Sequence, residues 1–68
     1  METLKRGDTV RYVGEIFPDL ANETYEVVQV YPGTFSGIPY PDGTVEIIGL
    51  ESWKLFKKHR FDFEKIES

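Results

Sequence analysis

The residues with the clearest capacity for binding chemistry lie in one short basic segment near the end of the chain. Residues 51–60 have a net charge of +3, because one glutamate is set against four cations. The cations are Lys54, Lys57, Lys58 and Arg60, and a tryptophan and a phenylalanine are interleaved with them. Cations beside aromatic rings are typical of surfaces that contact phosphates or carboxylates. The segment therefore predicts a basic patch for nucleic acid or for an acidic partner, unless these cations only keep a turn solvated.

The charge of the whole chain argues against nucleic acid and against membranes. The 68 residues have a formal net charge of −4, and outside residues 51–60 the net charge is −7. A mostly acidic surface repels phosphate backbones and anionic lipid headgroups. Nucleic acid is therefore a disfavoured partner, a membrane is not expected, and an unidentified protein or peptide is the preferred partner.

A second candidate site consists of aromatic side chains, namely Tyr31, Phe35, Tyr40 and Trp53. Three of them lie in or beside residues 32–43, which hold three of the four prolines and three of the six glycines. This composition predicts a long loop closed by a Tyr-Pro-Asp-Gly turn. Long loops in compact domains are often functional, so exposed rings here could hold an extended peptide. The alternative is that Phe35 and Tyr40 cap one end of the domain and that Trp53 belongs to its wall.

Catalytic and metal chemistry lack the residues that they need. The chain has no cysteine and a single histidine, His59, which is too few nitrogen and sulfur ligands for a structural zinc site. No glycine-rich phosphate loop or nucleophile elbow occurs, and so short a chain leaves little room for an enclosed pocket. We therefore expect neither enzymatic activity nor a cofactor.

The targeting signals are also missing from this sequence. Its first residues contain no apolar stretch of the signal-peptide kind, and no apolar run approaches the ~18 residues of a spanning helix. These features predict a cytoplasmic protein.

Alternating apolar residues predict short strands in the first half of the chain. Val10 and Tyr12 share one face of a strand over residues 9–13, and residues 24–31 form the strongest strand pattern. The alternation changes sides at residues 27–28, which predicts a bulge. Between these strands, apolar residues at 16, 17 and 20 predict an irregular loop that folds back over the domain.

The last third of the chain fits two architectures. In the first, a strand ends at Gly49, and further strands at 53–56 and 61–66 flank a tight or helical turn at 57–60. In the second, residues 51–66 form a C-terminal helix on a three-stranded sheet, because their apolar residues also fall near helical spacing. The clean alternation after Arg60 favours the strands.

The order of these patterns resembles that of the small stand-alone SH3-like barrel proteins of bacteria and of phages or prophages, whose architecture KOW and tudor domains share. The similarity covers nearly the whole chain and rests on core and turn positions. These are Gly7, Asp8, Val10, Tyr12, Leu20, Tyr25, Val27, Gly43, Val45, Phe56, Arg60 and Phe61. The resemblance implies a single all-β domain over residues 1–68, a five-stranded SH3-like barrel with a short helical turn before the last strand.

The function that this resemblance implies is non-catalytic binding, most of all of another protein through the loop aromatics. The chain lacks the Ala-Leu-Tyr-Asp-Tyr segment and paired tryptophans of signalling SH3 domains, which disfavours proline-rich ligands. Two alternatives remain open, a nucleic-acid contact through the basic patch and a structural role in which an open edge strand self-associates. The expected state in solution is a monomer or a weak homo-oligomer.

Overall fold

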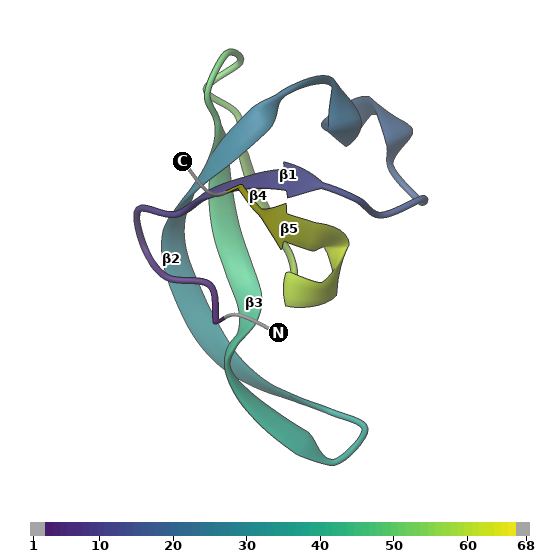
Figure 1. The fold of residues 1–68 in the computed structure, drawn as a ribbon, viewed down its shortest axis with the longest axis vertical. Helices are drawn as coiled ribbons and strands as arrows, with labels where there is room; N and C mark the ends of the chain where they lie inside the picture. The colour runs from purple at the N-terminus through teal and green to yellow at the C-terminus, as the bar shows by residue number, and fades with distance from the viewer. Residues whose placement is uncertain (1–2, 67–68) are drawn as a thin grey trace.

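The computed structural model describes residues 3–66 and folds them into one antiparallel sheet of five strands (Figure 1). The strands are β1 (Thr9–Tyr12), β2 (Thr24–Phe35), β3 (Ile38–Gly49), β4 (Leu55–His59) and β5 (Phe63–Lys65). Within the described range the only helical elements are two short 3-10 helices, η1 (Pro18–Asn22) and η2 (Arg60–Asp62). The predicted all-β class with five strands and a helical turn before the last is confirmed, and the alternative with a C-terminal helix is wrong.

The order of the strands across the sheet is β4-β3-β2-β1-β5. Successive strands from β1 to β4 are therefore neighbours, and β5 returns to pair with β1 on its other side. The sheet is not closed, so β4 and β5 are its two edges. Among residues 3–66 no helix has the length and apolar character needed to cross a membrane.

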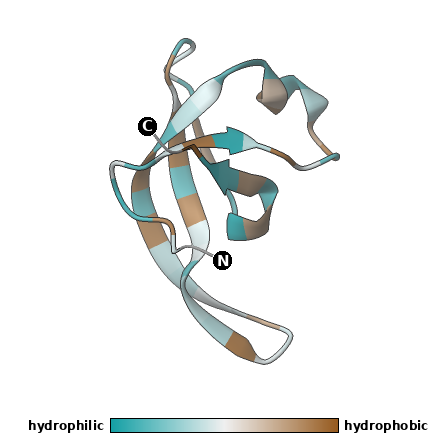
Figure 2. Cartoon of the chain, in the orientation of Figure 1, coloured by the Kyte–Doolittle hydropathy of each residue, from teal (hydrophilic) through white to brown (hydrophobic). Residues whose placement is uncertain are grey.

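The interior is built from the inward-facing residues of every strand. Apolar and polar residues alternate along β2 and β3, as Figure 2 shows by colour. The buried apolar residues are Leu4, Val10, Tyr12, Leu20, Tyr25, Val27, Val45, Ile47 and Phe63. Because Val10 and Tyr12 are both buried while Arg11 is exposed, the predicted faces of the first strand are confirmed. The register shift between Val27 and Gln29 likewise confirms the predicted bulge.

The predicted loop over residues 32–43 is wrong, because these residues continue β2 and β3 as a two-stranded ribbon (Figure 1). Its tip is the pair Ser36 and Gly37, whose φ angles are 51° and 77°. Positive φ at both central residues is the two-residue turn that matches the twist of a hairpin. Proline is tolerated here because a two-stranded ribbon has an open edge on both sides, and Pro32 coincides with a second register shift.

The strands of the last third are displaced from their predicted positions. β4 begins at Leu55 and extends through His59, so the predicted turn over 57–60 is wrong, and the chain turns at η2 instead. Trp53 cannot belong to this strand because its φ is 61°. The final strand is shorter than predicted, since Arg60–Asp62 forms η2 before β5 begins at Phe63.

Candidate functional site

The loop between β1 and β2, residues 13–23, is fixed to the core by two tyrosine hydroxyls. The hydroxyl of Tyr12 accepts a hydrogen bond from the backbone N–H of Phe17 at 3.2 Å. The hydroxyl of Tyr25 donates to the carbonyl oxygen of Leu20 at 2.7 Å, inside the protein. Burial, together with the nearby charge of Glu23, raises the pKa of Tyr25, so this hydroxyl remains a donor at neutral pH. We refer to residues 13–23 as the β1–β2 loop.

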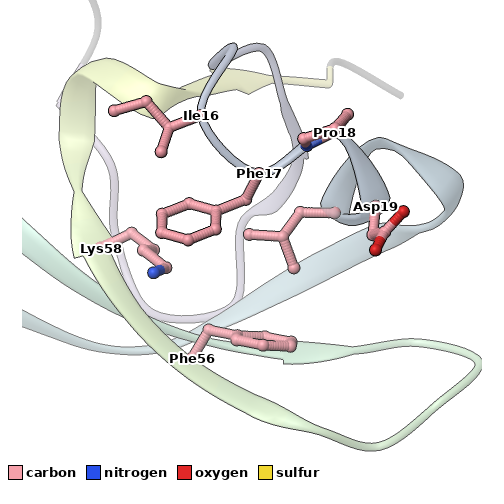
Figure 3. A pocket seen from close by; sticks show the side chains of 7 residues that line it. Ile16, Phe17, Pro18, Asp19, Phe56 and Lys58 are labelled. Carbon is pink, nitrogen blue, oxygen red and sulfur yellow. The ribbon is translucent and has the colours of Figure 1, made fainter.

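The anchored loop forms one wall of a groove, and the inner face of β4 forms the other (Figure 3). The groove encloses about 330 Å³ and is lined by Ile16, Phe17, Pro18, Asp19, Leu20, Phe56 and Lys58. At its rim the ammonium nitrogen of Lys58 lies 3.9 Å from the centre of the Phe17 ring. A second, more polar hollow of about 280 Å³ shares Ile16, Phe17 and Lys58 with the first. Its other lining residues are Thr44, Lys57, His59 and Asp62. We call the first hollow the β4 groove.

The β1–β2 loop presents apolar surface to solvent at this groove. Ile16 is 80% exposed and Phe17 is 45% exposed. The prediction that the loop folds back over the domain holds for Leu20, which is buried, but not for these two side chains. An apolar lining with a cation at the rim can receive an apolar side chain and pair with a nearby carboxylate.

The outer face of β4 carries a separate cation. The ammonium nitrogen of Lys57 lies 4.4 Å from the centre of the Tyr31 ring, and the Tyr31 hydroxyl donates to Glu46 at 3.1 Å. This hydrogen bond to the carboxylate is the main reason why the pKa of Tyr31 is raised. Side chains alternate between the faces of a strand, so Lys57 and Lys58 lie on opposite faces of β4.

The turn between β3 and β4 is held by a carboxylate from the other side of the groove. One oxygen of Glu23 accepts hydrogen bonds from the backbone N–H groups of Glu51 and Ser52, both at 3.0 Å. Hydrogen bonds from Ser52 and Glu51 lower the pKa of Glu23. Trp53 follows in this turn with a positive φ and is 72% exposed. Positive φ is strained for a bulky residue, and here the strain accompanies a ring that points into solvent.

The four aromatic residues of the predicted protein-binding surface lie in three different places. Phe35 and Tyr40 pack together with a ring-centre distance of 6.0 Å, and both also contact Phe61. Phe35 and Tyr40 are half-buried at the ribbon, and Phe61 is exposed. Tyr31 instead packs under Lys57, and Trp53 lies at the opposite end of β3. The structure therefore does not gather the four rings into one surface.

The predicted basic patch is also divided. Lys54 and Lys57 are exposed and Lys58 borders the groove, but Arg60 is 5% exposed. The guanidinium of Arg60 forms an ion pair with Asp42, which is fully buried. Three lysines thus remain on or beside β4. Within residues 3–66 no group of three or more acidic or histidine side chains could hold a metal ion.

Sequence reasoning missed the two features that define this site. Ile16 and Phe17 were expected to be covered, although two large apolar residues in a polar, proline-containing loop are the available signal. Asp42 was predicted to lie in the Tyr-Pro-Asp-Gly turn, and no local pattern indicates its burial against a residue 18 positions away.

Comparison with known proteins assigns no family. No protein-family model matches the sequence, and neither a curated protein nor a solved structure matches it.

Proposed function

We propose that this protein is a non-catalytic binding module that holds a segment of another protein in the β4 groove. The observation that carries the proposal is the exposed pair Ile16 and Phe17 standing over an apolar hollow with Lys58 at its rim. An exposed apolar patch rimmed by charge is typical of a protein-binding surface. The loop that forms it is held by two buried tyrosines, so the groove is preformed.

We infer that the open sheet belongs to the SH3-like barrel type. Support comes from the strand order, in which β1 to β4 are sequential neighbours and β5 returns beside β1. The long loop after β1 and the 3-10 turn before β5 also agree with the resemblance of the sequence. In this architecture the groove lies beside the first long loop, which agrees with a recognition role.

The chemistry of the groove favours an apolar and acidic partner segment. Its lining is mainly apolar, so it suits an aliphatic or aromatic side chain. Lys54, Lys57 and Lys58 are concentrated on or beside β4 in a chain with a net charge of −4. Carboxylates on the partner would therefore be attracted to this edge and repelled from most of the remaining surface.

The two alternative functions have less support. Nucleic-acid binding through residues 54–60 loses one of its four cations, because Arg60 is committed to Asp42. The remaining lysines point to both faces of β4, whereas nucleic-acid binders present a basic stripe. Self-assembly through the edge of β4 would place the lysines of one copy against those of another.

A peptide-library selection tests the proposal. Displayed random twelve-residue peptides are selected on the folded protein, and the enriched peptides are measured by fluorescence anisotropy at two salt concentrations. We expect enrichment of peptides that combine carboxylates with aliphatic or aromatic residues. Their affinity should fall about tenfold in Ile16→Ser, because one well-buried apolar contact is removed, and also in Lys58→Glu.

Matched variants control for loss of apolar surface and for change of charge. Ile38→Ser removes an exposed isoleucine at the start of β3, and Arg6→Glu reverses an exposed charge beside Glu26 and Val28. Both should bind the enriched peptides as the parent protein does. Failure to enrich any peptide, or equal affinity for the groove variants and their controls, would contradict the proposed function.

A further inference from the structure

The backbone of β4 has an unused hydrogen-bonding edge. β4 is the last strand of the sheet on its side and pairs only with β3 among the described strands. The N–H of Gly49 donates to the carbonyl oxygen of Lys54 at 2.9 Å, just before β4 begins. Antiparallel pairs alternate between hydrogen-bonded and non-bonded, so the next bonded residues are Phe56, opposite Ile47, and Lys58. The N–H and C=O groups of residues 55 and 57 and the N–H of residue 59 therefore point away from β3, while the C=O of His59 begins η2 as its N-cap residue.

The two faces of this edge differ in chemistry. The residues whose backbone points outward, Leu55, Lys57 and His59, have side chains that are exposed on the outer face. The residues bonded to β3, Phe56 and Lys58, direct their side chains to the inner face, where they line the β4 groove. A strand added to this edge would thus present alternate side chains to a lysine-bearing outer face and to an apolar groove.

A second copy of this chain is a poor occupant for the edge. Antiparallel pairing of β4 with the same strand of another copy would place Lys57 beside its own equivalent, with Lys54 and Lys58 nearby. Like charges opposite one another destabilise a pair of strands, and lysines on edge strands oppose edge-to-edge association. The same lysines attract a strand that carries carboxylates. The charge of the edge therefore selects an acidic strand from a different protein.

We propose that β4 recognises its partner by strand addition, in which an acidic segment pairs antiparallel to Leu55–His59 and places its apolar residues in the β4 groove. This inference rests on the proposed function and specifies its mode of recognition. In an antiparallel pair, residues directly opposite one another share a face and a hydrogen-bonding role. The partner residues whose backbone bonds to Leu55, Lys57 and His59 therefore direct their side chains to the outer face. We expect these partner residues to be the ones that carry carboxylates. The groove-facing residues direct their own backbone groups away from β4.

Backbone methylation of a synthetic peptide tests this geometry. The probe is a blocked nine-residue peptide that alternates glutamate with valine and has one phenylalanine in place of the central valine. In one derivative the backbone nitrogens of the inner glutamates are methylated. In the other derivative the backbone nitrogens of the apolar residues are methylated. Calorimetry should show binding of the parent peptide, a loss of at least about tenfold with methylated glutamates, and nearly unchanged binding with methylated apolar residues.

The other outcomes have separate meanings. Equal binding of both derivatives would overturn strand addition and leave groove binding, and hence the proposed function, standing. Loss of binding only with methylated apolar residues would overturn the antiparallel direction, because parallel pairing reverses which residues bond to the edge. No binding of the parent peptide would overturn this inference, while the library selection decides the proposed function independently. A dimer in light scattering would overturn it in favour of a second copy.

Two substitutions at one position repeat the test on the protein. Lys57→Ala removes the charge of the side chain and keeps the outward-pointing backbone N–H group. Lys57→Pro removes both the charge and the N–H group. Because this N–H group points away from β3, its loss takes no donor from the hydrogen bonds between β3 and β4. The proline variant should bind the parent peptide about tenfold more weakly than the alanine variant. Equal affinities of two folded variants would overturn the proposal.

Discussion

Arg60 and Asp42 form an ion pair in the interior of the protein, with 2.6 Å between Nη1 of the guanidinium and Oδ1 of the carboxylate. Asp42 is fully buried, and its second oxygen accepts a hydrogen bond from the backbone N–H of Leu4, also at 2.6 Å. The guanidinium carbon lies 4.8 Å from the centre of the Tyr40 ring. One carboxylate on β3 therefore connects the N-terminal segment, the ribbon and η2.

Removing the charge of Asp42 should strongly destabilise the protein. Asp42→Asn retains an acceptor for Leu4 but removes the buried carboxylate charge that pairs with the guanidinium of Arg60. Breaking a buried pair from one side costs about 3–5 kcal/mol. A chain of this size has a free energy of unfolding on the order of 5 kcal/mol, so urea denaturation should show a variant near the limit of folding.

A double variant tests whether the loss of stability comes from breaking the ion pair between Asp42 and Arg60. Asp42→Asn combined with Arg60→Met removes both charges of the pair and keeps the Leu4 contact, so it should recover most of the lost stability. A single variant with the urea midpoint of the parent protein would show that the pair contributes nothing.

The hydroxyl of Tyr25 should contribute more to the stability of the β1–β2 loop at the groove than to the stability of the sheet. Tyr25→Phe leaves the buried ring in place and deprives the Leu20 carbonyl of its donor, which costs about 1–2 kcal/mol. The backbone amides of residues 16, 17, 19 and 20 should then exchange with solvent faster than in the parent protein, while those of β2 and β3 keep their relative protection. Uniform acceleration throughout the sheet would contradict this assignment.

Gly43 should be intolerant of any side chain. A Cβ atom at this position would lie 2.7 Å from both the Cα and the N of Gly33, on the paired strand beside the second register shift. The backbone would have to move, so Gly43→Ala should cost about 1–3 kcal/mol. Gly33→Ala is the matched control, because its nearest neighbour at 3.3 Å is the rim of the Phe35 ring. Thermal unfolding should rank Gly43→Ala clearly below Gly33→Ala, and the reverse order would contradict this close approach of the two backbones.

The stability of the β3–β4 turn should depend on acidic pH through Glu23. Its pKa is lowered from the ordinary value of 4.5 by the N–H groups and the hydroxyl that bind its carboxylate. A lowered carboxyl pKa adds stability that is fully present above 4.5 and is lost as the pH falls through the lowered value. Glu23→Gln keeps an acceptor oxygen but cannot titrate, so its melting temperature should fall less between pH 7 and pH 3.

Glu26 supplies the control for this experiment. Its side chain is exposed on β2, and Glu26→Gln removes the same charge without touching the turn. If both variants change the pH dependence of the melting temperature equally, the turn is not the origin of the effect.

The sequence determined the sheet better than the site. Alternation located Val10 and Tyr12 correctly, and the change of face after Val27 indicated the bulge, because both are local patterns of period two. Helical spacing after residue 50 was misleading since pairing with β3 outweighs local propensity. The prolines and glycines of 32–43 suggested a loop, although a ribbon with open edges accommodates them.

The site depends on relationships that no local pattern contains. Asp42 and Arg60 are 18 residues apart, and their burial follows from the contact between β3 and η2 in the folded chain. The groove exists because Tyr12 and Tyr25 hold a loop of irregular backbone against the sheet. The sequence showed the residue types, but it did not show which of these residues contact one another in the fold.

The most direct test of recognition at β4 is amide hydrogen exchange of residues 55–59, measured by NMR with and without the alternating glutamate–valine peptide. Strand addition predicts that the outward-facing amides of Leu55, Lys57 and His59 become strongly protected on binding. The amides of Phe56 and Lys58, already bonded to β3, should change much less. Protection that appears on the β1–β2 loop but leaves the outward-facing amides of β4 unchanged would contradict the account.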